Sequence, residues 1–587
     1  MGEVSTPARP MRRAGPARPQ AAAPQRAVAE LLRSDWFTVV LHWLSAIAMF
    51  LSLFTGMRIA ADSLNAVIPK MLAPILPQGE VWTVHFYAGL SFFLTATAYI
   101  IYLRLGQLFS RNSLAKLRVM LMPAPMKMKW GALNTALHWL LYILLSVMMI
   151  TGVTMYLGYG GSIIQIHRAV AIALIGYILA HVIVHFLYGG WRQLLRIFIP
   201  ASLMMKGRST SKPAWVSLAV AIPVTAAIAA VDVGTRDTLV AGPVAQAPAF
   251  DKFLEDPVWT SARPVYVHTS QGENLGGTGE SLVEIRAVHD DKKIYFAFRW
   301  EDPTRSIARL PLIKKEDGWH MLGGKADTMD VVDFYEDKFS VIFNPSSSFG
   351  DGGVAHLGPA PLADKPVPMN GRGLHYTTDG SYVEMWQWKS TRGGLVGGMD
   401  HQYMGPPREP TPDEAKGIAR YQAGYWNYDG AAPYVYNYVS EPPGGYRGTI
   451  GVKYLPKDLE ATLKAMGKPV HDPNAGMDED QRYWMYEDET VPYSKEADDK
   501  IPVGTIIPGV MLHGRGEYTG ARGAIHAKAK WADGHWTLIA SRDLKASDTK
   551  DQEFAPGREI YMWVAVYDHT QTRHSRHTRP VRLVVQE

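Results

Sequence analysis

Five apolar segments lie in the first 235 residues of this 587-residue chain, and they constrain its fold more than any other feature. About 20 apolar residues cross the hydrocarbon core of a bilayer as one helix. Four segments reach that length without interruption, whereas the fifth is Ala-rich and contains Pro223. We therefore predict a membrane-spanning helical bundle, with helices over roughly residues 36–57, 84–103, 133–157, 163–187 and 214–231.

The charges between these segments predict their orientation. Loops 104–130 and 188–213 carry Lys and Arg but no acidic residue, so both are expected to be cytoplasmic. The Pro-, Ala- and Arg-rich residues 1–33 are expected to form a disordered cytoplasmic tail and not a signal peptide. With five spans, everything after Val231 lies outside the cytoplasm. The expected location is the bacterial inner (cytoplasmic) membrane, with a periplasmic C-terminal domain.

The chain changes character after a linker at residues 232–248. The stretch "LVEIRAVHDDKKIYFAFRW" predicts a β-hairpin that turns at residues 290–292, and "DKFSVIF", "YVEMWQW", "AIHAKAKWADGHWTLIASR" and "REIYMWVAVYDH" also predict strands. Many short strands with Gly/Pro-rich connections predict an extracytoplasmic all-β sandwich, in which residues 400–500 form long insertion loops. We see no internal repeat. The expected domains are a tail (1–33), a four-helix domain (34–205), a fifth span with its linker (206–248) and a β-sandwich (249–587).

Composition excludes several functional classes. The chain has no Cys, which excludes disulfides, thiolate zinc sites, iron–sulfur clusters ligated by this chain and covalent haem attachment through CxxCH. Any metal must be held by His, Met, Lys or carboxylates. The net charge of +5 does not indicate a nucleic-acid partner, because the basic residues concentrate in short loops beside apolar segments. No nucleophile elbow, P-loop or dinucleotide fingerprint suggests substrate chemistry.

The segment "IHRAVAIALIGYILAHVIVHF" places three His residues in an apolar span. On a helix, His167 and His181 lie within about 40° of each other and roughly 21 Å apart in depth. His85 begins the second span on the same side as His167, and His42 lies in the first span level with His181. Two imidazole pairs are therefore predicted at two depths. Since neutral imidazole is a common axial ligand of haem iron, the pattern favours two haems in the bundle.

Two other interpretations of these residues remain. An intramembrane His also serves as a hydrogen-bonding group between helices or as a residue at headgroup level. A proton relay is the second alternative, but relays usually use Asp and Glu, which the first four spans lack. The number of intramembrane His residues favours haem; they are His42, His85, His138, His167, His181 and His185.

The segments "VVLHWLSAIAMFLSLFTGM", "TVHFYAGLSFFL", "LNTALHWLLYILLSVMMITGVTMYL" and "IHRAVAIALIGYILAHVIVHF" resemble the bacterial cytochrome b561 family. This family includes the cytochrome b subunits of formate dehydrogenase and nickel–iron hydrogenase. The resemblance covers roughly residues 34–200 and implies a four-helix di-haem quinone oxidoreductase with His42, His85, His167 and His181 as ligands. His138 and His185 are additional candidates to replace a ligand, bind a haem propionate or handle a quinone proton.

The strings "PLIKKEDGWHML", "FYEDKFSVIFN", "AHLGPAPL", "GRGLHYTTDGSYVEMWQWKSTR" and "WVAVYDHTQTRHSRH" resemble the haem-binding domain related to the γ subunit of ethylbenzene dehydrogenase. The resemblance implies a β-sandwich that holds one b-type haem between its sheets, with a Lys and a Met as axial ligands, and that serves periplasmic molybdenum enzymes as an electron relay. Lys389 matches the family's Lys. It can bind iron only as a neutral amine, which requires burial, and Trp386 and Trp388 are expected to supply an apolar wall. The alternative is an exposed strand lysine.

The second ligand of the outer haem is left open by the resemblance. Met321, Met329 and Met369 all precede Lys389, and none lies in a string specific enough to choose. His356 and His375 compete with them, and related domains carry a covalent CxxCH motif near His356.

These resemblances imply a membrane-bound cytochrome that relays electrons between a periplasmic redox enzyme or cytochrome and the quinone pool. One alternative is a membrane-anchored carbohydrate- or ligand-binding module without haem, in which aromatic loops over residues 421–438 form a platform. The other is a transmembrane reductase of the metal or ascorbate type, which would use the same haems with a different donor and acceptor.

Overall fold

In the computed structural model, the chain forms five long apolar helices followed by a β domain. The helices are α2 (Trp36–Ala60), α4 (Val81–Leu105), α5 (Met126–Tyr156), α6 (Ser162–Leu195) and α7 (Ser211–Gly234). The structure describes residues 34–61, 67–198, 200–201, 204–205, 208–209, 211–323, 331–347, 362, 376–416, 421–439, 448–467, 472 and 474–587.

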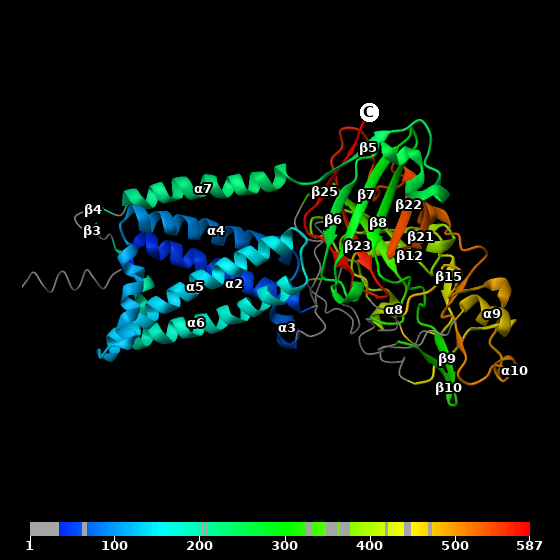
Figure 1. Ribbon diagram of the computed structural model, residues 1–587, viewed down its shortest axis with the longest axis horizontal. Helices are drawn as coiled ribbons and strands as arrows, with labels where there is room; N and C mark the ends of the chain where they lie inside the picture. Colours follow the sequence, from blue (N-terminus) through cyan, green and yellow to red (C-terminus); the bar gives the residue numbers. More distant parts are fainter. Residues whose placement is uncertain are drawn as a thin grey trace, which may run out of the picture. The chain divides into compact units, whose positions relative to one another are not determined.

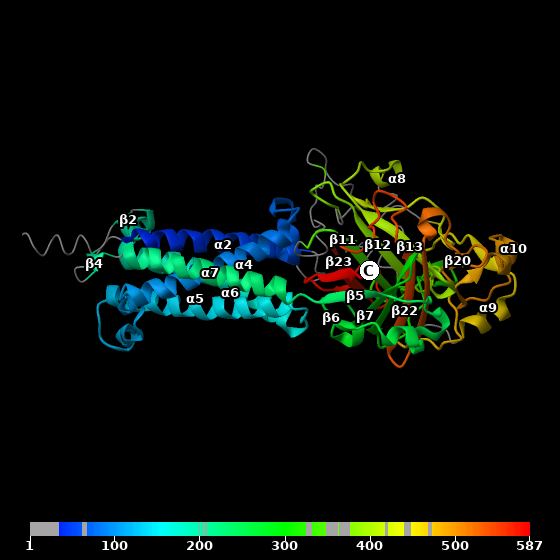
Figure 2. The ribbon, with the colours of Figure 1, turned by 90° about the horizontal axis from the view of Figure 1, so that it is seen from above.

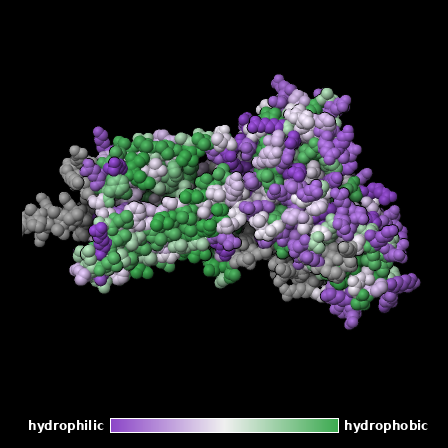
Figure 3. Space-filling view, in the orientation of Figure 1, coloured by the Kyte–Doolittle hydropathy of each residue, from purple (hydrophilic) through white to green (hydrophobic). Residues whose placement is uncertain are grey.

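All five helices are long and apolar enough to cross a membrane, which confirms the predicted bundle with a fifth span. Figures 1 and 2 show α2, α4, α5 and α6 running side by side. Large apolar side chains lie on their surface, as expected for helices solvated by lipid tails. Figure 3 shows this hydrophobic surface over the helices, whereas hydrophilic residues cover most of the visible face of the β domain. On α2 the exposed apolar residues include Leu44, Ile47, Leu51 and Phe54.

The helix α6 contains a break. Gly189 has φ −152° and ψ 18°, and Gly190 has φ 60° and ψ −156°, so neither residue is helical. Only glycine readily adopts the conformation of Gly190. The chain therefore changes direction between His185 and Gln193, although both residues are assigned to one helix.

The β domain is built on one sheet that closes on itself. Antiparallel pairing runs from β11 (Lys338–Asn344) through β12, β13, β21, β22 and β8 to β7, and parallel pairing joins β7, β5 and β25. The strand β23 then pairs with both β25 and β11, which completes the ring. The other bounds are β5 (Thr238–Pro243), β7 (Ser281–His289), β8 (Lys293–Glu301), β12 (Val383–Lys389), β13 (Gly398–Met404), β21 (Ile525–Ala532), β22 (His535–Asp543), β23 (Ile560–Tyr567) and β25 (Val581–Val585).

Apolar and aromatic residues from nearly every strand of the ring form one core inside the closed sheet. It includes Trp300, Trp386, Trp388 and Trp536, all fully buried. The predicted hairpin at residues 281–301 is confirmed, because β7 and β8 pair antiparallel. The structure therefore supports an all-β domain, with its layers joined into a single sheet.

The prediction of long insertion loops over residues 400–500 is only partly correct. The strand β13 is itself one of the strands of the closed ring. Residues further along build a second core with the segment 310–335, and they contribute short strands such as β15 (Tyr434–Tyr436) and β16 (Tyr454–Pro456). The alternation of apolar and polar residues is hard to detect there because these strands are only a few residues long.

Candidate functional site

One imidazole pair in the bundle joins His85 of α4 to His167 of α6, whose ring centroids lie 6.5 Å apart. Each ring has a threonine partner from another helix. Thr55 Oγ1 of α2 lies 2.9 Å from His85 Nδ1, and Thr151 Oγ1 of α5 lies 2.8 Å from His167 Nδ1. All four residues belong to one compact unit of the chain.

The threonine contacts fix which ring nitrogen is available. Thr55 Oγ1 donates to the Leu51 carbonyl at 2.6 Å, and Thr151 Oγ1 donates to the Val147 carbonyl at 2.7 Å. Since each hydroxyl proton is used in this way, the hydroxyl oxygen accepts from the imidazole Nδ1–H. In this tautomer Nε2 of each ring is unprotonated, which is the arrangement expected of a metal-binding histidine held by a hydrogen bond on its other nitrogen.

A glycine follows each of these threonines and lies against the same imidazole. A Cβ atom on Gly56 would lie 3.4 Å from His85 Cε1, and one on Gly152 would lie 3.7 Å from His167 Cε1. Both distances are ordinary van der Waals separations, so the backbone of each glycine lies directly beside its ring. The Thr-Gly pairs of α2 and α5 thus pack against the two histidines in the same way.

A second group of histidines belongs to the other compact unit of the chain. His42 and His181 lie with their ring centroids 6.5 Å apart at an interplanar angle of 27°. His138 lies 5.8 Å from His181 and 6.4 Å from His185 between centroids. The structure therefore brings the predicted pair together and adds both additional candidates to the same group.

The spacing of the rings fits a metal between them. Two metal–nitrogen bonds of about 2.0 Å each separate the centres of two imidazole rings by roughly 6 Å. The pairs His85–His167 and His42–His181 both show 6.5 Å. In addition, His42 Nδ1 is buried and has no hydrogen-bond partner within the part of the chain that the structure describes. Haem iron held between two imidazoles fits these residues.

The sequence carries a signal for the threonines that was missed, because "LHWL" and "TG" recur at equal spacing in α2 and α5. Leu41–Leu44 precedes Thr55-Gly56 as Leu137–Leu140 precedes Thr151-Gly152, with His42 and His138 each thirteen residues before its threonine. The expectation that the chain has no internal repeat is therefore wrong. His138 is the counterpart of His42 in the second copy.

In the β domain, Lys389 is buried at the end of β12 with 4% of its side chain exposed, which excludes an exposed strand lysine. Its Nζ donates to Asp400 Oδ2 at 2.5 Å. The prediction that Trp386 and Trp388 surround this amine is wrong, because residues separated by an odd number of positions on a strand point to opposite faces. Both indoles lie in the core inside the ring, whereas Lys389 lies on the outer face of the sheet.

Cationic and tyrosine side chains collect around Lys389; we call them the outer cation cluster. Lys338 pairs in register with Lys389, and its Nζ lies 4.0 Å from the Tyr567 ring centroid. Arg309 lies 4.1 Å above Tyr436. Five cations face two carboxylates here, so the cluster has a net positive charge. The members are Arg309, Lys338, Lys389, Arg392 and Arg522, with Glu336 and Asp400.

The electrostatics of the cluster reflect burial and this positive charge. Burial lowers the pKa of Lys389, Asp400 opposes that shift, and Arg392 adds to it. Burial likewise lowers the pKa of Lys338. For Tyr436, burial alone would raise the pKa, but Arg392 and Arg309 together lower it to about 8. A buried lysine with a depressed pKa is the form required for an amine ligand.

The same face of the sheet also has an apolar region. Val383, Met385 and Met404 are buried together beside Ile342 and Tyr425. An apolar region next to buried cations fits a ligand that is flat, apolar and anionic at its edge, as haem is. Among the described residues, no methionine is shown to complete a pair with Lys389. Met321 packs against the second core, and Met329, His356, Met369 and His375 lie outside the described residues.

Comparison with protein families agrees with both halves of this description. Residues 256–579, more than half of the chain, match the family model described as ethylbenzene dehydrogenase. The chain belongs to this family. Residues 33–201 match the model described as prokaryotic cytochrome b561. This member of the ethylbenzene dehydrogenase family is therefore a fusion with a membrane-embedded b-type cytochrome that takes part in electron transfer.

No curated protein matches this member of the family. Among solved structures, a carbohydrate binding module family 9 from Caldicellulosiruptor kristjanssonii in complex with glucose shows 6% identity and a TM-score of 0.22, covering 60% of this chain and 96% of that one. A putative carbohydrate-binding protein from Bacteroides uniformis shows 7% identity and a TM-score of 0.24, covering 60% of this chain and 100% of that one. Likenesses at these TM-scores support no argument about fold or function.

Proposed function

We propose that this cytochrome relays electrons between a redox partner at its C-terminal domain and a quinone in the membrane. The observation that carries the proposal is the equal 6.5 Å spacing of His85–His167 and His42–His181. We propose two membrane haems at these pairs and a third in the outer domain. Haem iron supplies one-electron transfer when bound.

The protein's own groups hold and orient the proposed membrane ligands. Thr55 and Thr151 accept hydrogen bonds from the two Nδ1–H groups and aim Nε2 between the rings. Gly56 and Gly152 leave room beside the same rings. On α6 the fourteen residues from His167 to His181 span about 21 Å, which places the two pairs at different depths.

In the outer domain, Lys389 is the proposed iron ligand, and the remaining cations of the cluster are the proposed partners of the propionates. Arg392 already has its Nε bound to Glu336 at 2.5 Å, while its NH1 lies near the Tyr436 hydroxyl at 3.2 Å. Lys389 has to leave Asp400 to bind iron, and Arg522 remains to neutralise that carboxylate, at 2.6 Å. Met321 and the residues Met369 and His356 stay proposals for the opposite ligand.

Orientation and partners follow from charge and chemistry. We propose an inner-membrane location with the C-terminal domain in the periplasm, because the basic loops 104–130 and 188–213 belong on the cytoplasmic side. A periplasmic redox enzyme, including one of the molybdenum type, is the proposed partner of the outer haem. A quinone would meet the bundle near His138 or His185, the imidazoles that the two proposed pairs leave over.

Haem stoichiometry tests this proposal. The full-length protein is purified in detergent, and its haem is measured by the pyridine haemochrome method against amino-acid analysis. We expect three b-type haems per chain. Two haems would leave the outer domain without one, and a protein without haem after adequate supply during expression would contradict the proposal entirely.

A further inference from the structure

Three side chains with metal-binding atoms meet at one end of the closed sheet. Asp337 immediately precedes β11, and Asp568 and His569 immediately follow β23. One ligand atom from each lies within 4.8 Å of the others, and all three residues are buried. Asp568 and His569 also line a pocket of about 530 Å³, which gives solvent a path to the group.

A fourth buried group faces this cluster. Asp302, which follows β8, is fully buried, and none of the described residues makes a hydrogen bond of good geometry to its Oδ2. Thr304 links it to the cluster, since the Thr304 N–H donates to Asp302 Oδ1 at 3.3 Å and its hydroxyl donates to Asp568 Oδ1 at 3.4 Å. The Trp300 indole N–H also faces the Asp302 carboxylate and lowers its pKa, although it makes no hydrogen bond of good geometry among the described residues.

Among the described residues, no Lys or Arg donates a hydrogen bond to Asp302, Asp337 or Asp568. Arg305 interacts with Asp337 at longer range, but its guanidinium donates to the backbone oxygens of Asp478 and Gln481.

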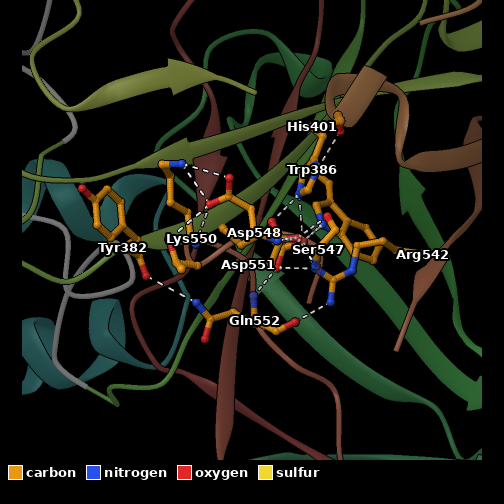
Figure 4. A network of polar contacts seen from close by, with 12 residues as sticks. Tyr382, Trp386, His401, Arg542, Ser547, Asp548, Lys550, Asp551 and Gln552 are labelled. Atoms are coloured by element: carbon orange, nitrogen blue, oxygen red, sulfur yellow. Dashed lines mark hydrogen bonds and ion pairs between the residues drawn. The ribbon is translucent and has the colours of Figure 1, made fainter. Parts of the chain in front are cut away.

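A second group of buried carboxylates in the same domain has positively charged or imidazole side chains beside it. Glu384 accepts from Trp386 Nε1, His401 Nε2 and Arg542 NH1 at 2.6–3.0 Å. Figure 4 shows Asp551 held by Ser547 beside Arg542, which lies 3.7 Å from it. Two carboxylates there face a guanidinium and an imidazole. The Asp302 cluster has three carboxylates and one imidazole, so it lacks a cation.

From this difference we infer that Asp302, Asp337, Asp568 and His569 form a binding site for a divalent cation that prefers oxygen ligands, Ca²⁺ or Mn²⁺. His569 Nδ1 is hydrogen-bonded to Asp568 Oδ1, which leaves Nε2 as its possible ligand atom. Carboxylate donors dominate, which favours Ca²⁺ and Mn²⁺ over Zn²⁺. The site is independent of the proposed haems.

The test uses the full-length protein in detergent after EDTA treatment and removal of the chelator. CaCl₂ or MnCl₂ is added, unbound metal is removed, and bound metal is counted by elemental analysis. We expect one equivalent of at least one cation per chain and a thermal midpoint that rises by several degrees when it is present. The haem spectrum, recorded on the same samples, separates this outcome from the fate of the proposed relay.

Asp302→Asn gives the sharper test, because its thermal midpoint should change in opposite directions depending on whether the wild type binds a cation. If a cation binds, the variant loses at least tenfold in affinity, and its midpoint falls below that of the wild type in the presence of the cation. If no cation binds, the variant removes an uncompensated buried charge, and its midpoint rises in every buffer. Asp551→Asn is the matched control, expected to be destabilised with and without cation while still taking up one equivalent.

The inference is overturned if the wild type binds neither Ca²⁺ nor Mn²⁺, or if Asp302→Asn is more stable than the wild type in saturating amounts of both. Should Asp302→Asn fail to fold, metal uptake and the cation-dependent midpoint of the wild type still decide the question.

Discussion

The two candidate redox regions of this protein are built from different chemistry. In the bundle, the groups around the proposed iron sites are imidazoles and threonine hydroxyls, and His85 and His167 are each hydrogen-bonded to a threonine. In the β domain, the groups around Lys389 are mostly ionised, with more cations than carboxylates. A charge is costly in lipid, whereas a β domain in water can bury several charges if most are paired. The surrounding solvent therefore decides which residue types can serve a redox site.

The largest effect is expected where a neutral imidazole ligand is removed. His42→Ala and His181→Ala should each lose one haem per chain and with it electron transfer to quinone, because the proposed iron site then keeps only one of its two paired imidazoles. Haemochrome analysis and quinol-dependent reduction kinetics measure the loss. His138→Ala is the control, since its ring shares the group but lies outside the proposed pair, and it should keep all haems. Full haem content in His181→Ala would refute the pairing.

Removal of the buried amine should affect the other region alone. Lys389→Ala is expected to lose the outer haem or convert it to a high-spin form, while the two membrane haems keep their low-spin spectra. Electronic and EPR spectra of the full chain distinguish these outcomes. Asp400→Asn is a suitable control, because it removes the partner of Lys389 without removing the amine. If the spectra of Lys389→Ala equal those of the wild type, Lys389 is not a ligand.

Lowering the pH should affect the proposed haems of the two regions differently. Burial lowers the pKa of Lys389, which favours the neutral amine in the folded protein. Protons compete with iron for that amine, so the outer haem should become high-spin as the pH falls and recover as the pH rises. The membrane haems, with imidazole ligands, should change less over the same titration. A single transition shared by all haems would contradict the distinction.

The smallest effect concerns the threonines of the bundle. In Thr55→Val and Thr151→Val the imidazole Nδ1–H loses its acceptor, which makes the ring a weaker electron donor. Loss of a hydrogen bond of about 1 kcal/mol corresponds to about 40 mV for a one-electron couple. We expect the potential of the haem held by His85 and His167 to rise by about that amount with the haem retained. Ser146→Ala, which removes a hydroxyl bonded only to the Tyr142 carbonyl, is the control.

The bundle could be predicted well from the sequence because its information is local. Apolar length fixed the helices, and helical periodicity placed His167 and His181 on one face. The threonines also had a local signal, the repeat of "LHWL" and "TG", which was overlooked. The sequence also predicts which face of the sheet carries Lys389, since side chains alternate along a strand and Trp386 and Trp388 therefore lie on the opposite face.

The remainder of the β-domain site could not be predicted because it depends on strand pairing. Lys338 and Lys389 are adjacent only because β11 and β12 pair in that register. Arg522 reaches Asp400 from a segment more than a hundred residues away. The Asp302 cluster requires the ends of β8, β11 and β23 to meet when the sheet closes. No spacing in the sequence encodes these distances.

The break at Gly189–Gly190 determines the surroundings of His185. In an uninterrupted helix, residue 193 would lie about 12 Å beyond residue 185 along the axis. Because the chain turns at Gly190, the Gln193 amide instead lies 3.3 Å from His185 Nδ1. Two residues without side chains thus give this imidazole a polar neighbour that a straight helix would carry out of its reach.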